Sequence, residues 1–102
     1  MAVFNVTKEN FTEIRNSAKP VLLDFYADWC GPCRMVSPLV DEIAEEHSEF
    51  TVGKVNVDEQ PELAVAFGVS SIPMLTVIKN GAVTAHAVGT RPKSAILDML
   101  NG

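Results

Sequence analysis

A chain of 102 residues has the usual length of a single globular domain. Hydrophobic residues make up 47% of it and charged residues 21%, a balance that supports a buried core and excludes a disordered protein. The net charge of −5 disfavours nucleic-acid binding, because it repels phosphate groups. Without a signal-like N-terminus or a long apolar run, we expect one domain over residues 1–102, cytoplasmic and without a membrane partner.

The first quarter of the chain predicts two strands separated by a helix. Residues 3–6 are typical of a short strand, and apolar residues at helical spacing predict an amphipathic helix over residues 11–18. Pro20 ends that helix. Residues 21–27 are almost wholly apolar and too few for a typical helix, so they predict a buried strand. Asp24 is the only charged residue in it.

The middle of the chain predicts a long helix, a strand and a short helix. Residues 32–47 have helical spacing, and Pro38 inside this stretch predicts a kink, since proline removes one hydrogen bond. Valines in alternation predict a strand over residues 51–57. Pro61 and Gly68 bracket the short helix, at the start and just after the end.

The last third predicts a hairpin followed by a helix. Residues 74–79 and 82–88 are two strands joined by Asn80-Gly81, a dipeptide that suits a tight antiparallel turn. Pro92 opens the final helix. Alternating strands and helices imply an α/β fold with parallel strands and helices on both faces, and the C-terminal antiparallel hairpin makes the central sheet mixed.

Cys30 and Cys33 are the only cysteines, and they lie where the second strand meets the long helix. A helix N-terminus presents free N–H groups and the positive end of the dipole, which favour a thiolate. Cys30 is therefore the candidate nucleophile, and Cys33 is placed to attack the mixed disulfide that Cys30 forms. Gly31 lets a partner backbone come close, and Pro32 is tolerated in the first helical turn.

Two other readings of the cysteine pair remain open. A structural disulfide would close a loop of about four residues and add only roughly 1.9 kcal/mol of stability. A zinc site would use Cys30, Cys33 and His47, which fit the first three ligands of a zinc-finger spacing. Its fourth ligand is missing, since the next histidine is His86. We therefore expect no metal.

The segment from Phe25 to Arg34 resembles the active-site segment of the thioredoxin family, and the resemblance extends over the whole chain. It implies a thioredoxin fold and a monomeric dithiol reductant of protein disulfides, with no cofactor beyond the Cys30–Cys33 disulfide, that thioredoxin reductase re-reduces. Gly-Pro between the cysteines resembles the reducing members, whereas oxidases and isomerases usually carry histidine there. The other elements of the resemblance are Asp24, Pro38, the run from Lys54 to Asp58, Ile72-Pro73, the run from Lys79 to Gly81, and Val88-Gly89.

The resemblance also assigns roles near the cysteines. Asp24 in an apolar strand is costly to ionise, so burial should raise its pKa; by resemblance it is the acid/base that helps Cys33 lose its proton. Lys54 resembles the lysine that approaches this carboxylate and helps hold its charge. Two alternatives remain: Asp24 at a solvent-exposed strand end, and Lys54 as an ordinary exposed lysine.

A shallow apolar surface beside the cysteines is implied for binding protein partners. By resemblance Pro73 is cis and faces the cysteines, although most X-Pro bonds are trans. Ile72 would offer its backbone to an extended substrate. Trp29 would lie on the rim, or else in the core. The predicted members of this surface are Trp29, Gly31, Pro32, Ile72, Pro73, Val88 and Gly89.

The sequence departs from the family pattern in three places. Met74 stands where a threonine usually follows the cis-proline. Asp28 precedes the tryptophan, where other residues are commoner in the family, and the last helix ends early. We expect Met74 at the edge of the site, where a flexible side chain adapts to varied surfaces; the alternative is that it fills the core. A non-catalytic binding subunit is the rival function, yet docking alone needs neither cysteine nor Asp24.

Overall fold

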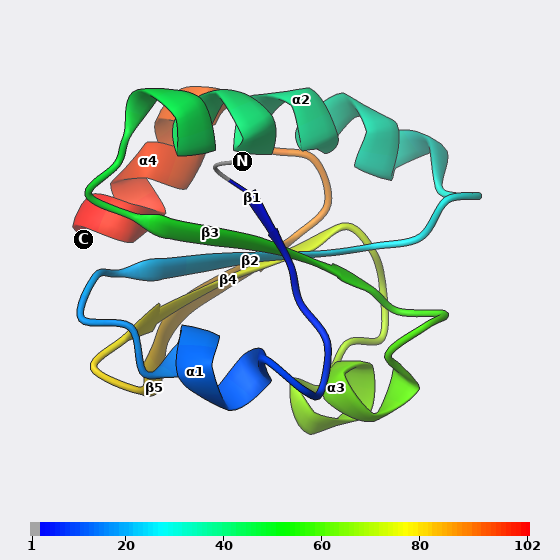
Figure 1. Cartoon of the computed structure of the whole chain (residues 1–102). Helices are drawn as coiled ribbons and strands as arrows, with labels where there is room; N and C mark the ends of the chain where they lie inside the picture. The colour runs from blue at the N-terminus through cyan, green and yellow to red at the C-terminus, as the bar shows by residue number, and fades with distance from the viewer. Residues whose placement is uncertain (1–2) are drawn as a thin grey trace.

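The computed structural model describes residues 3–102, in which a five-stranded mixed sheet lies between two layers of helices (Figure 1). The expected α/β thioredoxin fold is confirmed. The strands follow the order β1-β3-β2-β4-β5 across the sheet. The elements are β1 (Val3–Asn5), α1 (Phe11–Arg15), β2 (Val21–Tyr26), α2 (Gly31–Glu46), β3 (Thr51–Asn56), α3 (Pro61–Ala66), β4 (Met74–Lys79), β5 (Ala82–Val88) and α4 (Lys93–Asn101).

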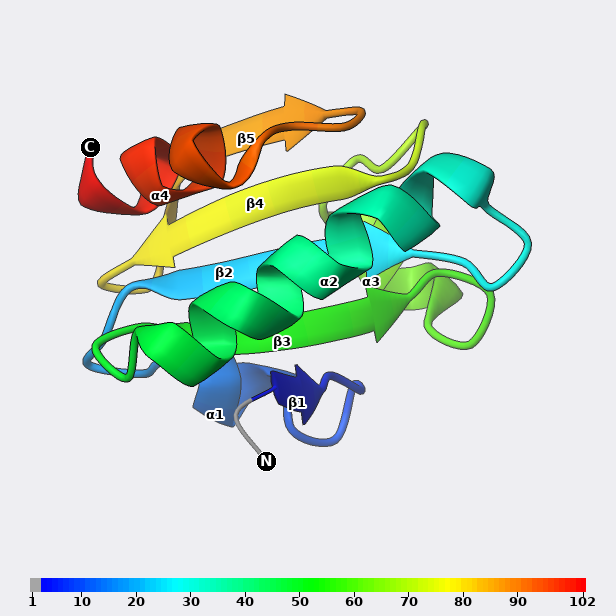
Figure 2. The ribbon, with the colours of Figure 1, turned by 90° about the horizontal axis from the view of Figure 1, so that it is seen from above.

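The sheet contains both parallel and antiparallel strand pairs. β3 lies between β1 and β2 and runs parallel to each. β4 runs antiparallel to β2 on one side and to β5 on the other. Seen from above, α2 crosses β2 and β3, while α4 lies beside β4 and β5 (Figure 2). β2 is the central strand, and a short loop after it leads into α2, at whose N-terminus the cysteines lie.

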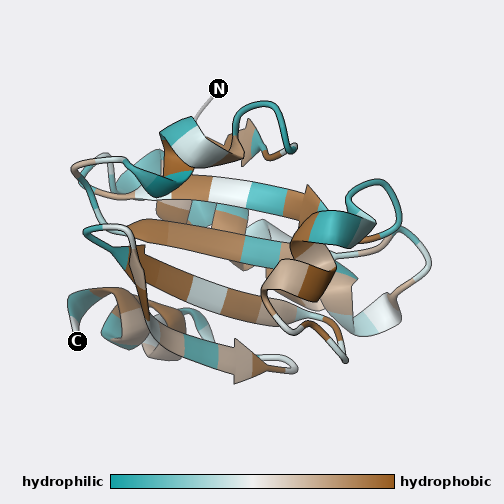
Figure 3. Ribbon diagram, turned by 90° about the horizontal axis from the view of Figure 1, so that it is seen from below, coloured by the Kyte–Doolittle hydropathy of each residue, from teal (hydrophilic) through white to brown (hydrophobic). Residues whose placement is uncertain are grey.

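Two apolar layers hold the helices onto the sheet, and the strands between them are mostly hydrophobic (Figure 3). Alternating strand residues feed the two layers in turn, because successive side chains point to opposite faces. The upper layer, under α2 and α4, includes Leu22, Val36, Val40, Ile43, Val52, Leu75, Val77, Ile96 and Leu100. The lower layer, over α1 and α3, includes Val6, Ile14, Val21, Leu23, Phe25, Val55, Leu63, Met74 and Ile78.

Most predicted boundaries agree with the structure to within one residue, and the hairpin agrees fully. Asn80 has φ 53° and Gly81 has φ 81°, the pair of positive values that a type I′ turn requires. α2 continues through Pro38 as one helix. The kink expected at Pro38 stays a prediction.

The prediction for α1 is wrong at its C-terminus, since the helix ends at Arg15 instead of extending to residue 18. Asn16 follows with φ −87° and ψ 10°, and the Ser17 N–H bonds to the carbonyl of Ile14. The Ser17 hydroxyl lies 2.8 Å from the hydroxyl of Thr51 on β3. Asn and Ser have low helix propensity because their side chains form polar contacts outside a helix, and here the contact of Ser17 with β3 accompanies the early end of α1.

Candidate redox site

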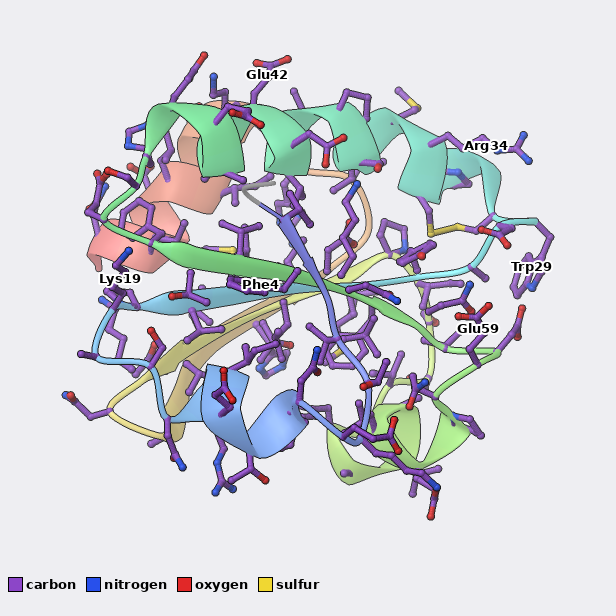
Figure 4. The ribbon with its side chains drawn as sticks, viewed as in Figure 1. Phe4, Lys19, Trp29, Arg34, Glu42 and Glu59 are labelled. Atoms are coloured by element: carbon purple, nitrogen blue, oxygen red, sulfur yellow. A yellow bond between two sulfur atoms is a disulfide. The ribbon has the colours of Figure 1, made fainter. Side chains whose placement is uncertain are left out.

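The site begins at the loop between β2 and α2, where Cys30 and Cys33 form a disulfide. Figure 4 shows this bond at the first turn of α2. Cys30 is the N-cap residue, with φ −86° and ψ 111°, and its Sγ accepts a 3.2 Å hydrogen bond from the Cys33 N–H. Gly31 and Pro32 are exposed between them. A free helix N–H directed at sulfur stabilises a thiolate at Cys30 when the disulfide is reduced.

A second segment lies against the cysteines. The Sγ of Cys30 is 3.9 Å from the carbonyl oxygen of Ile72. The Ile72–Pro73 peptide bond is cis, as the resemblance implied. The Gly89 N–H donates a 2.8 Å hydrogen bond to the Pro73 carbonyl, and Val88, which is exposed, is the strand partner of the residue after Pro73. The structure thus places Ile72 against Cys30 and joins the Ile72-Pro73 segment to Val88 and Gly89.

Trp29 lies on the rim of the site with 70% of its surface exposed, so the core alternative is wrong. Figure 4 shows its side chain at the edge of the molecule, between the disulfide-bearing loop and the segment that carries Glu59. Its Nε1–H donates a 2.9 Å hydrogen bond to Asp58 Oδ2, a contact that was not predicted from the sequence. Trp29 and Ile72 both line a hollow of about 170 Å³; its other lining residues are Val57, Ala64, Val69, Ser70 and Ser71.

Asp24 is buried, with 1% of its surface exposed, so the solvent-exposed alternative is wrong. Strand alternation places it on the same face as Leu22, under α2. Neither carboxylate oxygen has a hydrogen-bond partner within residues 3–102. Burial raises the pKa of Asp24 to about 7; the positive charge of Lys54 opposes this rise and the negative charge of Asp41 adds to it. The group can therefore take up or release a proton near neutral pH.

Lys54 on β3 is the register partner of Asp24, and only 18% of its side chain is exposed. It is therefore not an ordinary exposed lysine. Its ammonium forms a 2.8 Å ion pair with Asp41 Oδ1 and a hydrogen bond to the hydroxyl of Ser37, both on α2. No ion pair joins it to Asp24 in the described part of the chain. Lys54 thus acts on Asp24 through its field and not by contact.

Ser37 and Asp41 are site residues that sequence reasoning missed. They are four residues apart on α2, the spacing that places two side chains on one helix face. Two polar groups facing a strand lysine would have been a usable signal, but it needs the registration of α2 over β3, which the sequence alone does not supply.

Met74 does not lie at the edge of the site, and that expectation is wrong. It is 5% exposed and belongs to the lower apolar layer, together with Phe25 and Ile78. Side chains of β4 alternate between the two faces of the sheet, and that of Met74 lies on the face opposite α2, in the lower layer. The alternative, that Met74 fills the core, is the correct one.

The structure also removes His47 as the third ligand of a zinc site at the cysteines. His47 is the C-cap of α2, with its Nδ1 2.9 Å from Glu49 Oε2, whereas the cysteines lie at the opposite end of this 16-residue helix. A helix of that length spans about 24 Å. Within residues 3–102, no group of three His, Cys, Asp or Glu side chains is close enough to hold a metal ion. The same residues contain no helix long and apolar enough to cross a membrane.

Comparisons with known proteins agree with this geometry. The family model described as thioredoxin matches residues 2–102. A thioredoxin of Pyropia yezoensis is 48% identical over 99% of this chain and 96% of its own length. A thioredoxin of Alicyclobacillus acidocaldarius is 45% identical over 93% and 91%. The solved structure of a mutant thioredoxin from Halobacterium salinarum superposes with a TM-score of 0.91 at 35% identity, covering 97% of this chain and 88% of that one. The chain therefore belongs to the thioredoxin family of thiol–disulfide oxidoreductases.

Proposed function

We propose that this protein works as a dithiol reductant of protein disulfides. The observation that carries the proposal is the placement of Cys30, which caps α2 and lies 3.9 Å from the Ile72 carbonyl beside the cis Pro73. An extended substrate segment bound along Ile72 brings its disulfide to this sulfur. The Gly31-Pro32 loop carries no histidine, which favours a reductant over an oxidase or an isomerase.

The first step forms a mixed disulfide. In the reduced protein the Cys30 thiolate attacks one sulfur of the substrate disulfide, a new S–S bond forms to Cys30, and the substrate S–S bond breaks. The electron pair of the broken bond leaves on the second substrate sulfur, which takes a proton from solvent. The Cys33 N–H and the dipole of α2 stabilise the attacking thiolate.

The second step releases the product. Cys33 loses its proton to the Asp24 carboxylate, and the resulting thiolate attacks the Sγ of Cys30. The Cys30–Cys33 disulfide forms, the bond to substrate breaks, and its electron pair leaves on the substrate sulfur that Cys30 had attacked, which takes a proton from solvent; two electrons have then moved to the substrate. A pKa of about 7 suits Asp24 to this transfer, because a group titrating near ambient pH both accepts and returns a proton.

Each turnover leaves the protein oxidised, so an external reductant must restore the dithiol. We assign this step to thioredoxin reductase and the substrate role to disulfide-containing proteins. A dithiol reductant is useful where the compartment keeps thiols reduced, which supports the cytoplasm. We further propose a monomer of one domain, with the cysteine pair as its only redox group.

The test is reduction of insulin disulfides, driven first by dithiothreitol and then by a thioredoxin reductase with its electron donor. We expect catalysed precipitation of the insulin B chain in both assays, abolished by Cys30→Ser. An Asp24→Asn variant should retain the first step and slow the second at neutral pH. Catalysis of disulfide formation in a reduced substrate, without insulin reduction, would instead identify an oxidase.

A further inference from the structure

The ammonium of Lys54 is held by a pair of side chains that the mechanism above does not use. Asp41 and Ser37 project from adjacent turns of α2 and take the Lys54 ammonium between them. The Asp41 side chain is 55% exposed, whereas the Lys54 side chain is mostly buried, so the buried lysine is paired with a carboxylate that reaches solvent. Asp24, directly opposite on β2, is left without a polar partner within residues 3–102.

We propose that Asp41 and Ser37 are positioning residues that draw the charge of Lys54 away from Asp24, and so set the pH range in which Asp24 exchanges the proton of Cys33. The proposal rests on the proton-transfer role given to Asp24 in the proposed function. If the pair were absent, the flexible side chain of Lys54 would turn toward the unpartnered carboxylate. A direct ion pair would favour the charged form of Asp24 and make it a weaker base.

The titratable groups around Asp24 come from three elements. Lys54 approaches from β3 and Asp41 from α2, and the phenol of Tyr26 lies on the same strand as Asp24, where burial raises the tyrosine pKa and the negative charge of Asp24 adds a smaller effect of the same sign. Asp41 has two effects of the same sign, since its own negative charge disfavours ionised Asp24 and its grip on Lys54 keeps the positive charge distant. The experiment must separate the direct effect from the grip.

The primary variant is Asp41→Asn, which keeps the shape of the side chain and removes its charge. Glu42→Gln is the matched control, because Glu42 is the next residue of the same helix but pairs with Lys93 on α4 at 3.1 Å. The measurements are the ¹³C NMR titration of the Asp24 carboxyl group and the pH profile of mixed-disulfide release. We expect Asp41→Asn to move both midpoints down by about 0.5 pH unit or more, and Ser37→Ala to move them less, in the same direction. Glu42→Gln should leave both unchanged.

A second set of variants, made in a Lys54→Met protein, isolates the effect that Asp41 has through the position of the Lys54 ammonium. In a Lys54→Met protein there is no ammonium to position, so Asp41→Asn retains only its direct effect and should shift the Asp24 midpoint by less than half as much. An equal shift in both backgrounds, or no shift in either, overturns the proposal. Failure of the proposed function has a different signature. In that case Asp24→Asn leaves the rate of mixed-disulfide release and its pH profile as in the unmodified protein, whatever Asp41→Asn does to the NMR midpoint.

Discussion

Both cysteines of the redox pair are buried, so their chemical difference has to come from local fields and not from exposure. Cys30 caps α2 and accepts the N–H of Cys33, whereas Cys33 lies inside the first turn. The backbone dipoles of the helix favour a negative charge at the first position, and their effect falls off along the first turn. The two thiols of the reduced protein should therefore ionise in separate pH ranges.

We expect iodoacetamide to alkylate Cys30 of the reduced protein at least about tenfold faster than Cys33 near pH 7, because the thiolate is the reacting species. Peptide mass mapping of briefly treated protein checks the order of labelling. Urea-unfolded protein is the control, in which the two rates should converge. Cys33→Ser should accumulate a mixed disulfide with a protein substrate through Cys30. Labelling of Cys33 first would reverse the roles assigned to the pair.

At the scale of the element, β4 shows how one strand serves both the core and the site. Its residues alternate between the two apolar layers, and Met74, although adjacent to Pro73, belongs to the lower one. A substitution there acts on packing and reaches the cysteines only indirectly.

Met74→Thr should lower the free energy of unfolding by about 1–3 kcal/mol, since it removes buried apolar volume and adds a buried hydroxyl. The ratio of rates on a small disulfide and on a protein disulfide should stay unchanged. Urea denaturation beside the two kinetic assays measures both quantities. Val88→Thr, on the exposed strand partner of Met74, is the matched control and should barely alter stability. A changed substrate ratio in Met74→Thr without loss of stability would contradict this prediction.

Gly53 on β3 is required by the close approach of the neighbouring strands. A Cβ there would collide with Cγ2 of Val6 and lie 3.4 Å from Cδ2 of Leu23. We expect Gly53→Ala to destabilise the protein by about 1–2 kcal/mol, because overpacking outweighs the smaller gain from restricting the unfolded chain. Thermal unfolding checks the change. Gly31→Ala is the control for stability alone, since a Cβ at Gly31 meets nothing within 4 Å. Equal melting temperatures for the two variants would exclude the clash.

Much of the fold could be predicted from the sequence because local signals and tertiary packing agree. The Asn80-Gly81 turn and the apolar run of β2 each have one conformation of low free energy, and both were predicted to within a residue. The end of α1 was not, since the Ser17–Thr51 contact that accompanies it joins residues 34 positions apart. The alternation of side chains along a strand can also be predicted from the sequence. Which face of the sheet Met74 occupies cannot, because that depends on the position of α2.

The site divides in the same way at the scale of the whole molecule. Cys30, Cys33 and Asp24 could be identified because each is chemically unusual where it stands in the sequence. Ser37 and Asp41 could not, since a serine and an aspartate on an amphipathic helix look like ordinary surface residues. Their contact with Lys54 arises only when α2 is laid across β3. Residues that act through another residue are thus visible only in the assembled molecule.

Global stability should carry the signature of Asp24 in its pH dependence. The pKa rises from an ordinary value of 3.8 to about 7 in the folded protein. Between these values the folded state binds more protons than the unfolded state, so the free energy of unfolding falls as pH rises. Each tenfold change in an ionisation constant is worth about 1.4 kcal/mol, which gives a loss of up to roughly 4 kcal/mol by pH 8. Below pH 3.8 the carboxyl group is protonated in both the folded and the unfolded state, so this loss of stability is absent.

Asp24→Asn removes the titrating group, so its stability relative to the unmodified protein should rise by roughly 2–4 kcal/mol between pH 4 and pH 8. Any cost of burying an unpaired amide is the same at both pH values and cancels from this difference. Urea unfolding of the oxidised proteins at several pH values measures it. Asp98→Asn, on the exposed side of α4, is the control, and its relative stability should stay level within about 0.5 kcal/mol. A level profile for Asp24→Asn as well would mean that the carboxyl group titrates near its ordinary pKa, and Asp24 would then be fully ionised at neutral pH and unable to hold the proton of Cys33.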